Sequence, residues 1–197
     1  MRRSKILLAI GVLALAAACA KAPEMEMNEA QTSINDARTA AQADVWAPED
    51  LQAAQSSFDA AKAEVEVQNE RFALTRNYDK ATELFAQAKV DAEKAKRAAV
   101  DNKEKARMEA EQNLQRATDA IAAARDALTK APRTKGTRAD IELFTSDLTG
   151  LEGSLEEVRA AIAAQDYKKA LSRAAAIIQE AEDMTAKLTE AAMRAGR

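Results

Sequence analysis

Between Glu49 and Ala131 the chain contains neither Gly nor Pro, the two residues that most readily interrupt a helix. The whole sequence of 197 residues holds only five Gly and three Pro. About a quarter of the residues are Ala, the strongest helix former. These features predict an all-α fold. Because so few breakers occur, the helix boundaries must be sought mainly in changes of phase of the apolar stripe.

Apolar residues recur at intervals of three and four over most of the chain, as in amphipathic helices. The pattern predicts a first helix from Met27 to about Trp46, followed by a second with Pro48 in its first turn and Phe72 as its last apolar position. The stripe then changes phase. We therefore expect a turn at residues 74–77, with Asn77 as N-cap of a third helix that runs from Tyr78 to about Ala131.

The remaining sequence predicts two more helices, rich in Leu and Ile. The fourth has its apolar stripe from Ile141 to Ile162, and the fifth begins at Tyr167 with Asp166 as N-cap. Gly150 and Gly153 interrupt the fourth helix, and the sequence favours a close helix crossing there over a mere weak point.

The two phase changes resemble each other. Asn77 and Tyr78 lie about 27 residues after Leu51, as Asp166 and Tyr167 do after Ile141, which indicates two divergent copies of a hairpin roughly 89 residues apart. We expect elongated antiparallel helical hairpins in a coiled-coil-like bundle. The expected division is a signal peptide at 1–18, a first hairpin region with one long helix at 19–131, and a second hairpin at 132–197.

Cys19 is the only cysteine, and it follows a short basic and apolar segment. Arg2, Arg3 and Lys5 precede an apolar run from Ile6 to Leu15, which is shorter than the roughly 20 residues that span a bilayer. The end of this segment resembles a lipobox, although Leu15 lies one position further from the cysteine than is usual. The resemblance implies diacylglyceryl and acyl chains on Cys19. An ordinary cleavage after Ala18, leaving a soluble periplasmic protein with a free thiol, is the alternative.

The residue after the cysteine bears on the destination of the chain. Ala20 stands where an Asp would retain a lipoprotein in the inner membrane, so the resemblance to Gram-negative sorting implies transfer to the outer membrane. Each buried methylene of an acyl chain contributes about 0.8 kcal/mol, so two or more chains would hold the protein on the bilayer. The expected location is the outer membrane, lipid-anchored and facing the periplasm.

The third helix carries an alanine-rich seam of six small or aromatic residues at helical spacing. Alanines let helices approach closely but bury little apolar area, so we expect the stretch from Ala81 to Ala127 to depend on a packing partner. The expected partner is another envelope protein or a second copy, and the alternative is a protruding, half-solvated helix. The predicted partner-helix packing residues are Ala81, Phe85, Ala88, Ala92, Ala95 and Ala99.

Composition argues against catalysis and against several ligand classes. The chain has no histidine, which removes the usual general base and the commonest metal ligand. Its acidic residues outnumber its basic ones by 32 to 29, and loss of residues 1–18 would remove three basic residues and no acidic ones. We therefore expect that the chain is not an enzyme and has no catalytic residue. We also expect that it binds no metal, cofactor, nucleic acid or small-molecule substrate.

The segment from Ala41 to Ala98 resembles a domain-of-unknown-function family of alanine-rich helical segments. Members occur in Gram-negative envelope lipoproteins, sometimes ahead of an OmpA-like peptidoglycan-binding module. The resemblance implies an envelope location and no known activity. It is carried by Ala47, Pro48, Glu49, Asp50 and Leu51, by Phe58 and Ala61, by Asn77, Tyr78, Asp79, Lys80 and Ala81, and by Ala88, Ala92 and Ala95.

These observations lead to two hypotheses. The first is a structural or scaffold lipoprotein of the cell envelope, anchored in the outer membrane through Cys19 and without catalysis. The second is a periplasmic adaptor or holdase lipoprotein whose alanine-rich seam binds a helix of another envelope protein.

Overall fold

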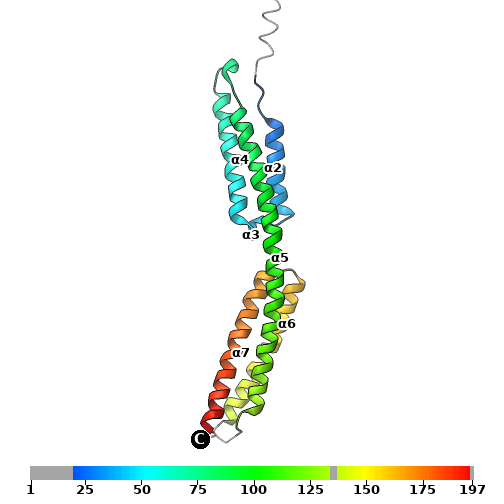
Figure 1. Ribbon diagram of the computed structural model, residues 1–197, viewed down its shortest axis with the longest axis vertical. Coiled ribbons are helices and arrows are strands. Elements are labelled where there is room, and N and C mark those ends of the chain that lie inside the picture. The colour runs from blue at the N-terminus through cyan, green and yellow to red at the C-terminus, as the bar shows by residue number, and fades with distance from the viewer. Residues whose placement is uncertain (1–19, 134–136, 196–197) are drawn as a thin grey trace, which may run out of the picture. The chain divides into compact units, whose positions relative to one another are not determined.

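The computed structural model describes residues 20–133 and 137–195, and within these ranges the chain is helical and contains no strand (Figure 1). No helix in these ranges is long and apolar enough to cross a membrane. The elements are α2 (Glu24–Thr39), α3 (Ala43–Trp46), α4 (Pro48–Asn69), the short 3-10 helix η1 (Ala73–Thr75), α5 (Asp79–Lys130), α6 (Arg138–Ala163) and α7 (Tyr167–Ala195). The expected all-α fold class is confirmed.

The contacts divide the chain into two compact units, residues 1–102 and residues 103–197. The division falls inside α5, which is helical throughout its 52 residues. The sequence places the domain boundary after Ala131 instead, where Pro132 follows the long helix. Residues of α5 on both sides of Asn102 are buried, and each set belongs to the core of its own unit.

In unit 1, α2, α4 and the first part of α5 bury a common core. Its larger side chains are Ile34, Leu51, Phe58 and Phe85, and the rest are alanines. The rings of Phe58 and Phe85 meet with their centroids 5.4 Å apart at 59°, a favourable tilted geometry. Because alanines line much of the interface, the helices can pack closely around these few large side chains.

In unit 2, the second part of α5 packs with α6 and α7. The buried side chains here are larger on average than in unit 1, because most of those in α6 and α7 are branched or long. Those buried in α5 are Ala110, Ala117, Ile121, Ala124 and Leu128. Those of α6 and α7 include Leu148, Leu151, Leu155, Val158, Tyr167, Ile177, Ile178, Met184 and Leu188.

The first predicted helix is in fact two helices. The chain leaves α2 at Thr39 and begins the short α3 at Ala43. Gln42, between them, has a φ of 54°, in the left-handed region. A stripe of apolar residues at helical spacing does not reveal this break, because Ala41 and Ala43 are buried on either side of it. Pro48 begins α4, as predicted.

The second helix ends earlier than its apolar stripe predicts. α4 stops at Asn69, and Phe72 lies beyond it with 71% of its surface exposed. Phe72 was expected on the buried face, so this prediction is wrong. The physical reason is that α4 ends at Asn69 and the chain turns at Glu70 and Arg71, so Phe72, which lies between α4 and η1, is no longer on the buried face of α4.

The two glycines of α6 do not mark a close helix crossing. Both are exposed, and a Cβ built on Gly150 or Gly153 would meet no atom within 4 Å. The favoured prediction is therefore wrong. The buried stripe of α6 passes through Leu148, Leu151 and Leu155, and the glycines lie off it.

Candidate functional site

The described residues place the predicted alanine-rich seam in the core of unit 1. Ala81, Ala88, Ala92, Ala95 and Ala99 have no exposed surface, and Phe85 is 1% exposed. Phe85, Ala88, Ala92, Ala95 and Ala99 share one core cluster with buried residues of α2 and α4 of the same chain, and Figure 1 shows these two helices beside the first part of α5. The helices that pack on this seam are thus supplied internally.

Ion pairs connect α5 to α2 and to α4 on the surface of unit 1. The Lys89 ammonium of α5 lies 2.8 Å from the Glu29 carboxylate of α2. That of Lys94 lies 2.8 Å from the Asp50 carboxylate of α4. The hydrogen bond to each carboxylate raises the pKa of each lysine above its ordinary value. These side chains are largely solvated, so each pair contributes little to stability.

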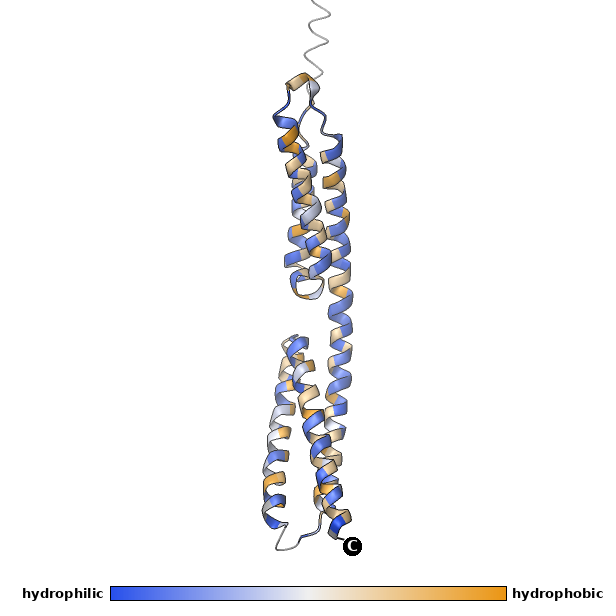
Figure 2. Ribbon diagram, turned by 90° about the vertical axis from the view of Figure 1, so that its left-hand side faces the viewer, coloured by the Kyte–Doolittle hydropathy of each residue, from blue (hydrophilic) through white to orange (hydrophobic). Residues whose placement is uncertain are grey.

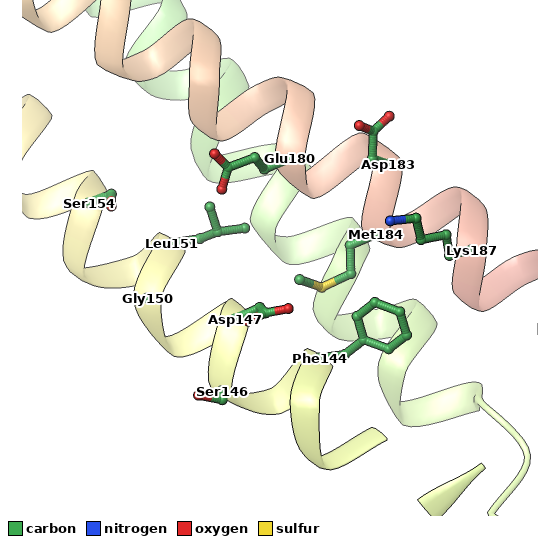
Figure 3. A pocket seen from close by; sticks show the side chains of 10 residues that line it. All are labelled: Phe144, Ser146, Asp147, Gly150, Leu151, Ser154, Glu180, Asp183, Met184 and Lys187. Carbon is green, nitrogen blue, oxygen red and sulfur yellow. The ribbon is translucent and has the colours of Figure 1, made fainter. Parts of the chain in front are cut away.

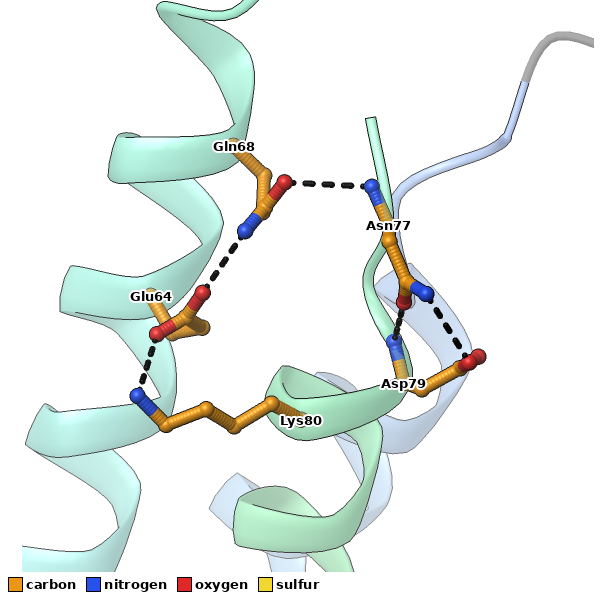
Figure 4. A network of polar contacts seen from close by, with 5 residues as sticks. All are labelled: Glu64, Gln68, Asn77, Asp79 and Lys80. Carbon is orange, nitrogen blue, oxygen red and sulfur yellow. Dashed lines mark hydrogen bonds and ion pairs between the residues drawn. The ribbon is translucent and has the colours of Figure 1, made fainter. Parts of the chain in front are cut away.

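The turn between α4 and α5 is held by a polar network (Figure 4). Gln68, only 4% exposed, accepts a hydrogen bond from the Asn77 backbone N–H through Oε1 at 3.1 Å and donates one through Nε2 to Glu64 at 2.8 Å. The second Glu64 oxygen pairs with the Lys80 ammonium at 2.7 Å. The contacts with Lys80 and Gln68 lower the pKa of Glu64. The network ties the end of α4 to the start of α5.

Asn77 performs the capping role that the sequence predicts for it. Its Oδ1 accepts the Asp79 backbone N–H at 2.7 Å, which satisfies a donor in the first turn of α5. Tyr78 is buried, and its hydroxyl donates to Asn69 Oδ1 at 2.6 Å. At the other predicted turn, Asp166 Oδ1 accepts the Lys169 backbone N–H at 3.2 Å, which confirms Asp166 as N-cap of α7.

Arg76 closes the outer side of the same turn. Its guanidinium donates to the backbone carbonyl of Asn69 at 2.8 Å and to that of Arg71 at 3.1 Å. These carbonyls lie at and just past the end of α4, where carbonyl groups lack intrahelical partners. A cation beside them also opposes the negative end of the helix dipole. The turn that carries Phe72 and Leu74 is therefore built on specific contacts.

Asn102 and Trp46 meet at the opposite end of unit 1. The Asn102 side chain, which is exposed, donates to the Trp46 carbonyl at 2.8 Å, at the end of α3. Trp46 itself is partly buried against the alanine-rich core. The bond from Asn102 to α3 is a contact that helical periodicity alone does not reveal.

A groove of about 500 Å³ lies between α6 and α7 (Figure 3). Phe144, Leu151 and Met184 lie in the space between the two helices, and the carboxylates of Asp147 and Glu180 stand at its edges. Among the described residues no group of three or more His, Cys, Asp or Glu side chains could hold a metal ion. The sequence predicts no ligand site at this groove, because its carboxylates occur on ordinary solvated helix faces, although Gly150, one of the two glycines of α6, lines it.

The predicted lipidation residue, Cys19, and the predicted signal peptide lie outside the described residues. Ala20 is the first residue that the structure describes, and α2 begins shortly afterwards at Glu24. The chain matches no protein-family model, no curated protein and no solved structure.

Proposed function

We propose that this chain is a structural or scaffold lipoprotein of the cell envelope, anchored through Cys19 in the outer membrane and facing the periplasm. The observation that carries the proposal is the basic segment, apolar run and single cysteine of residues 2–19. A helical bundle begins only five residues after that cysteine. The function is then mechanical: the acyl chains fix the position of the bundle and the helices supply surfaces and reach. No catalysis is part of the proposal.

The adaptor hypothesis has less support than the scaffold. A helix of another protein would have to displace α2 or α4 to reach the seam, because the seam residues are almost fully buried in unit 1. The partners that we propose are the bilayer, through the acyl chains, and envelope proteins or a second copy on other faces.

We also propose that the chain contains two divergent copies of an antiparallel hairpin, α4 with the first part of α5 and α6 with α7. Tyr78 and Tyr167 are both 6% exposed at the start of their helices. The residue before each Tyr offers a side-chain oxygen to a first-turn N–H. Superposition of the two hairpins with the same helix crossing angle would support duplication, and different helix crossings would count against it.

The anchor is tested by mass spectrometry of the mature N-terminus together with membrane fractionation. The expected N-terminal peptide begins at Cys19 and carries a diacylglyceryl group and an acyl chain. The matched variant is Ala20→Asp, which keeps the cysteine but should retain the protein in the inner membrane. An unmodified mature chain in the soluble periplasmic fraction would contradict the proposal.

A further inference from the structure

The turn between α4 and α5 exposes apolar side chains that contribute nothing to the core of unit 1. Phe72 is 71% exposed, more than any other large apolar side chain in the described ranges, and Leu74 is 51% exposed. Val67, in the last turn of α4, is 48% exposed. Figure 2 shows η1 in orange at the end of unit 1, next to blue segments. We call Val67, Phe72 and Leu74 the apolar tip.

The apolar tip is held outward by the structure beneath it. Arg76 bonds the carbonyls of Asn69 and Arg71, and Gln68 bonds the Asn77 backbone. A turn fixed on both sides presents Phe72 and Leu74 at little further entropic cost. Three such exposed apolar residues close together point to a surface that covers them.

The tip lies at the end of unit 1 at which α2 begins. Figure 1 shows residues 20–23, which precede α2, beside the α4–α5 turn. α2 and α5 both run away from this end, with Glu29 paired to Lys89. The ion pair places Glu29 and Lys89 at the same level, and Lys89 lies five residues further from the start of its helix than Glu29 does. At 1.5 Å per residue, the first residue of α2 is therefore about 8 Å further from this end of the unit than the first residue of α5.

The proposed anchor can reach the level of the tip. Cys19 lies five residues before Glu24, and five steps of extended chain span at most about 18 Å. That reach exceeds the offset of about 8 Å by roughly 10 Å, enough to bring Cys19 level with the turn. A lipid on Cys19 and the apolar tip can therefore meet the same bilayer surface.

We propose that the apolar tip is a second membrane contact, which inserts Phe72 and Leu74 into the interfacial region of the phospholipid bilayer that holds Cys19. This inference rests on the proposed lipid anchor. A single tether at the end of a short linker leaves a bundle free to tilt, and a second contact restricts it. Arg71, exposed beside Phe72, can face lipid phosphates while the two apolar side chains enter the interface.

The experiment uses the lipidated mature chain in vesicles of phosphatidylethanolamine and phosphatidylglycerol. Acylation consumes the only native thiol, so Leu74→Cys supplies a unique site for an environment-sensitive fluorophore. The matched control is Val45→Cys, an exposed apolar position (41%) in α3 at the opposite end of the same unit. Brominated lipids then report contact with the acyl region.

The tip proposal expects quenching by brominated lipids at position 74 at least about threefold stronger than at position 45. Phe72→Ser, at a side chain outside the core, should reduce the quenching at position 74 toward that of the control. Equal quenching at the two positions in an acylated chain would overturn the tip contact alone. A blue shift at position 74 without lipid quenching would mean that protein covers the tip and would also overturn it. A mature chain whose mass lacks acyl chains would overturn both proposals.

Discussion

The two glycines of α6 occupy helical positions that do not require glycine. Neither has a positive φ, and a Cβ would meet no atom within 4 Å at either site. Because Gly costs about 1 kcal/mol relative to Ala in a helix interior, Gly150→Ala and Gly153→Ala should each raise the free energy of unfolding by about that amount. Chemical denaturation measures the change.

A matched control for the glycines is Ala160→Gly, at an exposed position of the same helix. It should lower the free energy of unfolding by a similar amount of about 1 kcal/mol. Destabilisation by Gly150→Ala would instead mean that a close neighbour occupies that face.

Gln68 is a buried amide whose two ends are both used. Replacing it with Leu leaves the Asn77 backbone N–H without its partner and removes a donor to Glu64. An unsatisfied buried polar group costs about 1 to 3 kcal/mol, so Gln68→Leu should lower the free energy of unfolding by that amount. Gln52→Leu, at an exposed position of α4, serves as the control and should change stability little.

Glu64 makes the α4–α5 turn sensitive to acid. Its pKa is lowered below the ordinary value of 4.5 by Lys80 and Gln68, so the folded state binds a proton less readily than the unfolded state. The resulting stabilisation is complete above about pH 4.5 and is lost as the pH falls through the folded-state pKa. Glu64→Gln should therefore destabilise the chain at neutral pH and flatten its stability profile in acid.

Denaturation midpoints at about pH 7 and about pH 3.5 measure this effect. Glu66→Gln, on an exposed face of the same helix, is the matched control. If both variants showed the same pH profile as the parent chain, Glu64 would not be coupled to folding.

Local sequence signals identify capping residues but not the contacts that close a turn. Asn77 and Asp166 were recognisable because a short polar side chain precedes a new apolar stripe. The roles of Gln68 and Arg76 were not, because each bonds a backbone group several residues away in sequence. Phe72 was wrongly assigned to the buried face for the same reason. The apolar stripe does not show that α4 ends at Asn69, where Arg76 bonds the backbone carbonyl.

At the scale of elements, the alanine-rich seam of α5 leaves no room for side chains larger than alanine at its alanine positions. Ala88 has no exposed surface, whereas Ala86 on the same helix is exposed. Leu at position 88 would have to displace α2 or α4, and overpacking of this kind costs about 1 to 3 kcal/mol. Ala88→Leu should lower the thermal midpoint, and Ala86→Leu, the control, should leave it nearly unchanged.

Phase changes predicted most helices of this chain. α5 and α6 begin and end within a few residues of their predicted positions, and α7 begins at the predicted Tyr167, because each has a long, regular stripe. The break at Gln42 was missed, because it requires only one residue in a left-handed conformation and does not interrupt the apolar stripe. The six seam residues of α5 could be identified as packing positions, but periodicity cannot say which helices cover them.

At the scale of the whole chain, the two units should differ in stability. Unit 1 buries mostly alanines around a few large side chains, whereas unit 2 buries many Leu, Ile and Val residues. A buried Leu contributes about 1.5 to 3 kcal/mol and an Ala only a fraction of that. Amide hydrogen exchange should therefore be slower in α6 and α7 than in α2 and α4. Equal protection in the two sets of helices would contradict this expectation.

α5 contributes to both cores, but its middle belongs to neither. Residues 100–109 contain no buried side chain, and the pairs of Arg107 with Glu104 and Glu111 lie along the helix there. Lys103, Lys105 and Arg107 lie in this stretch. Brief digestion with trypsin should therefore nick α5 there early, and both fragments should keep their helical circular dichroism because each retains a complete core.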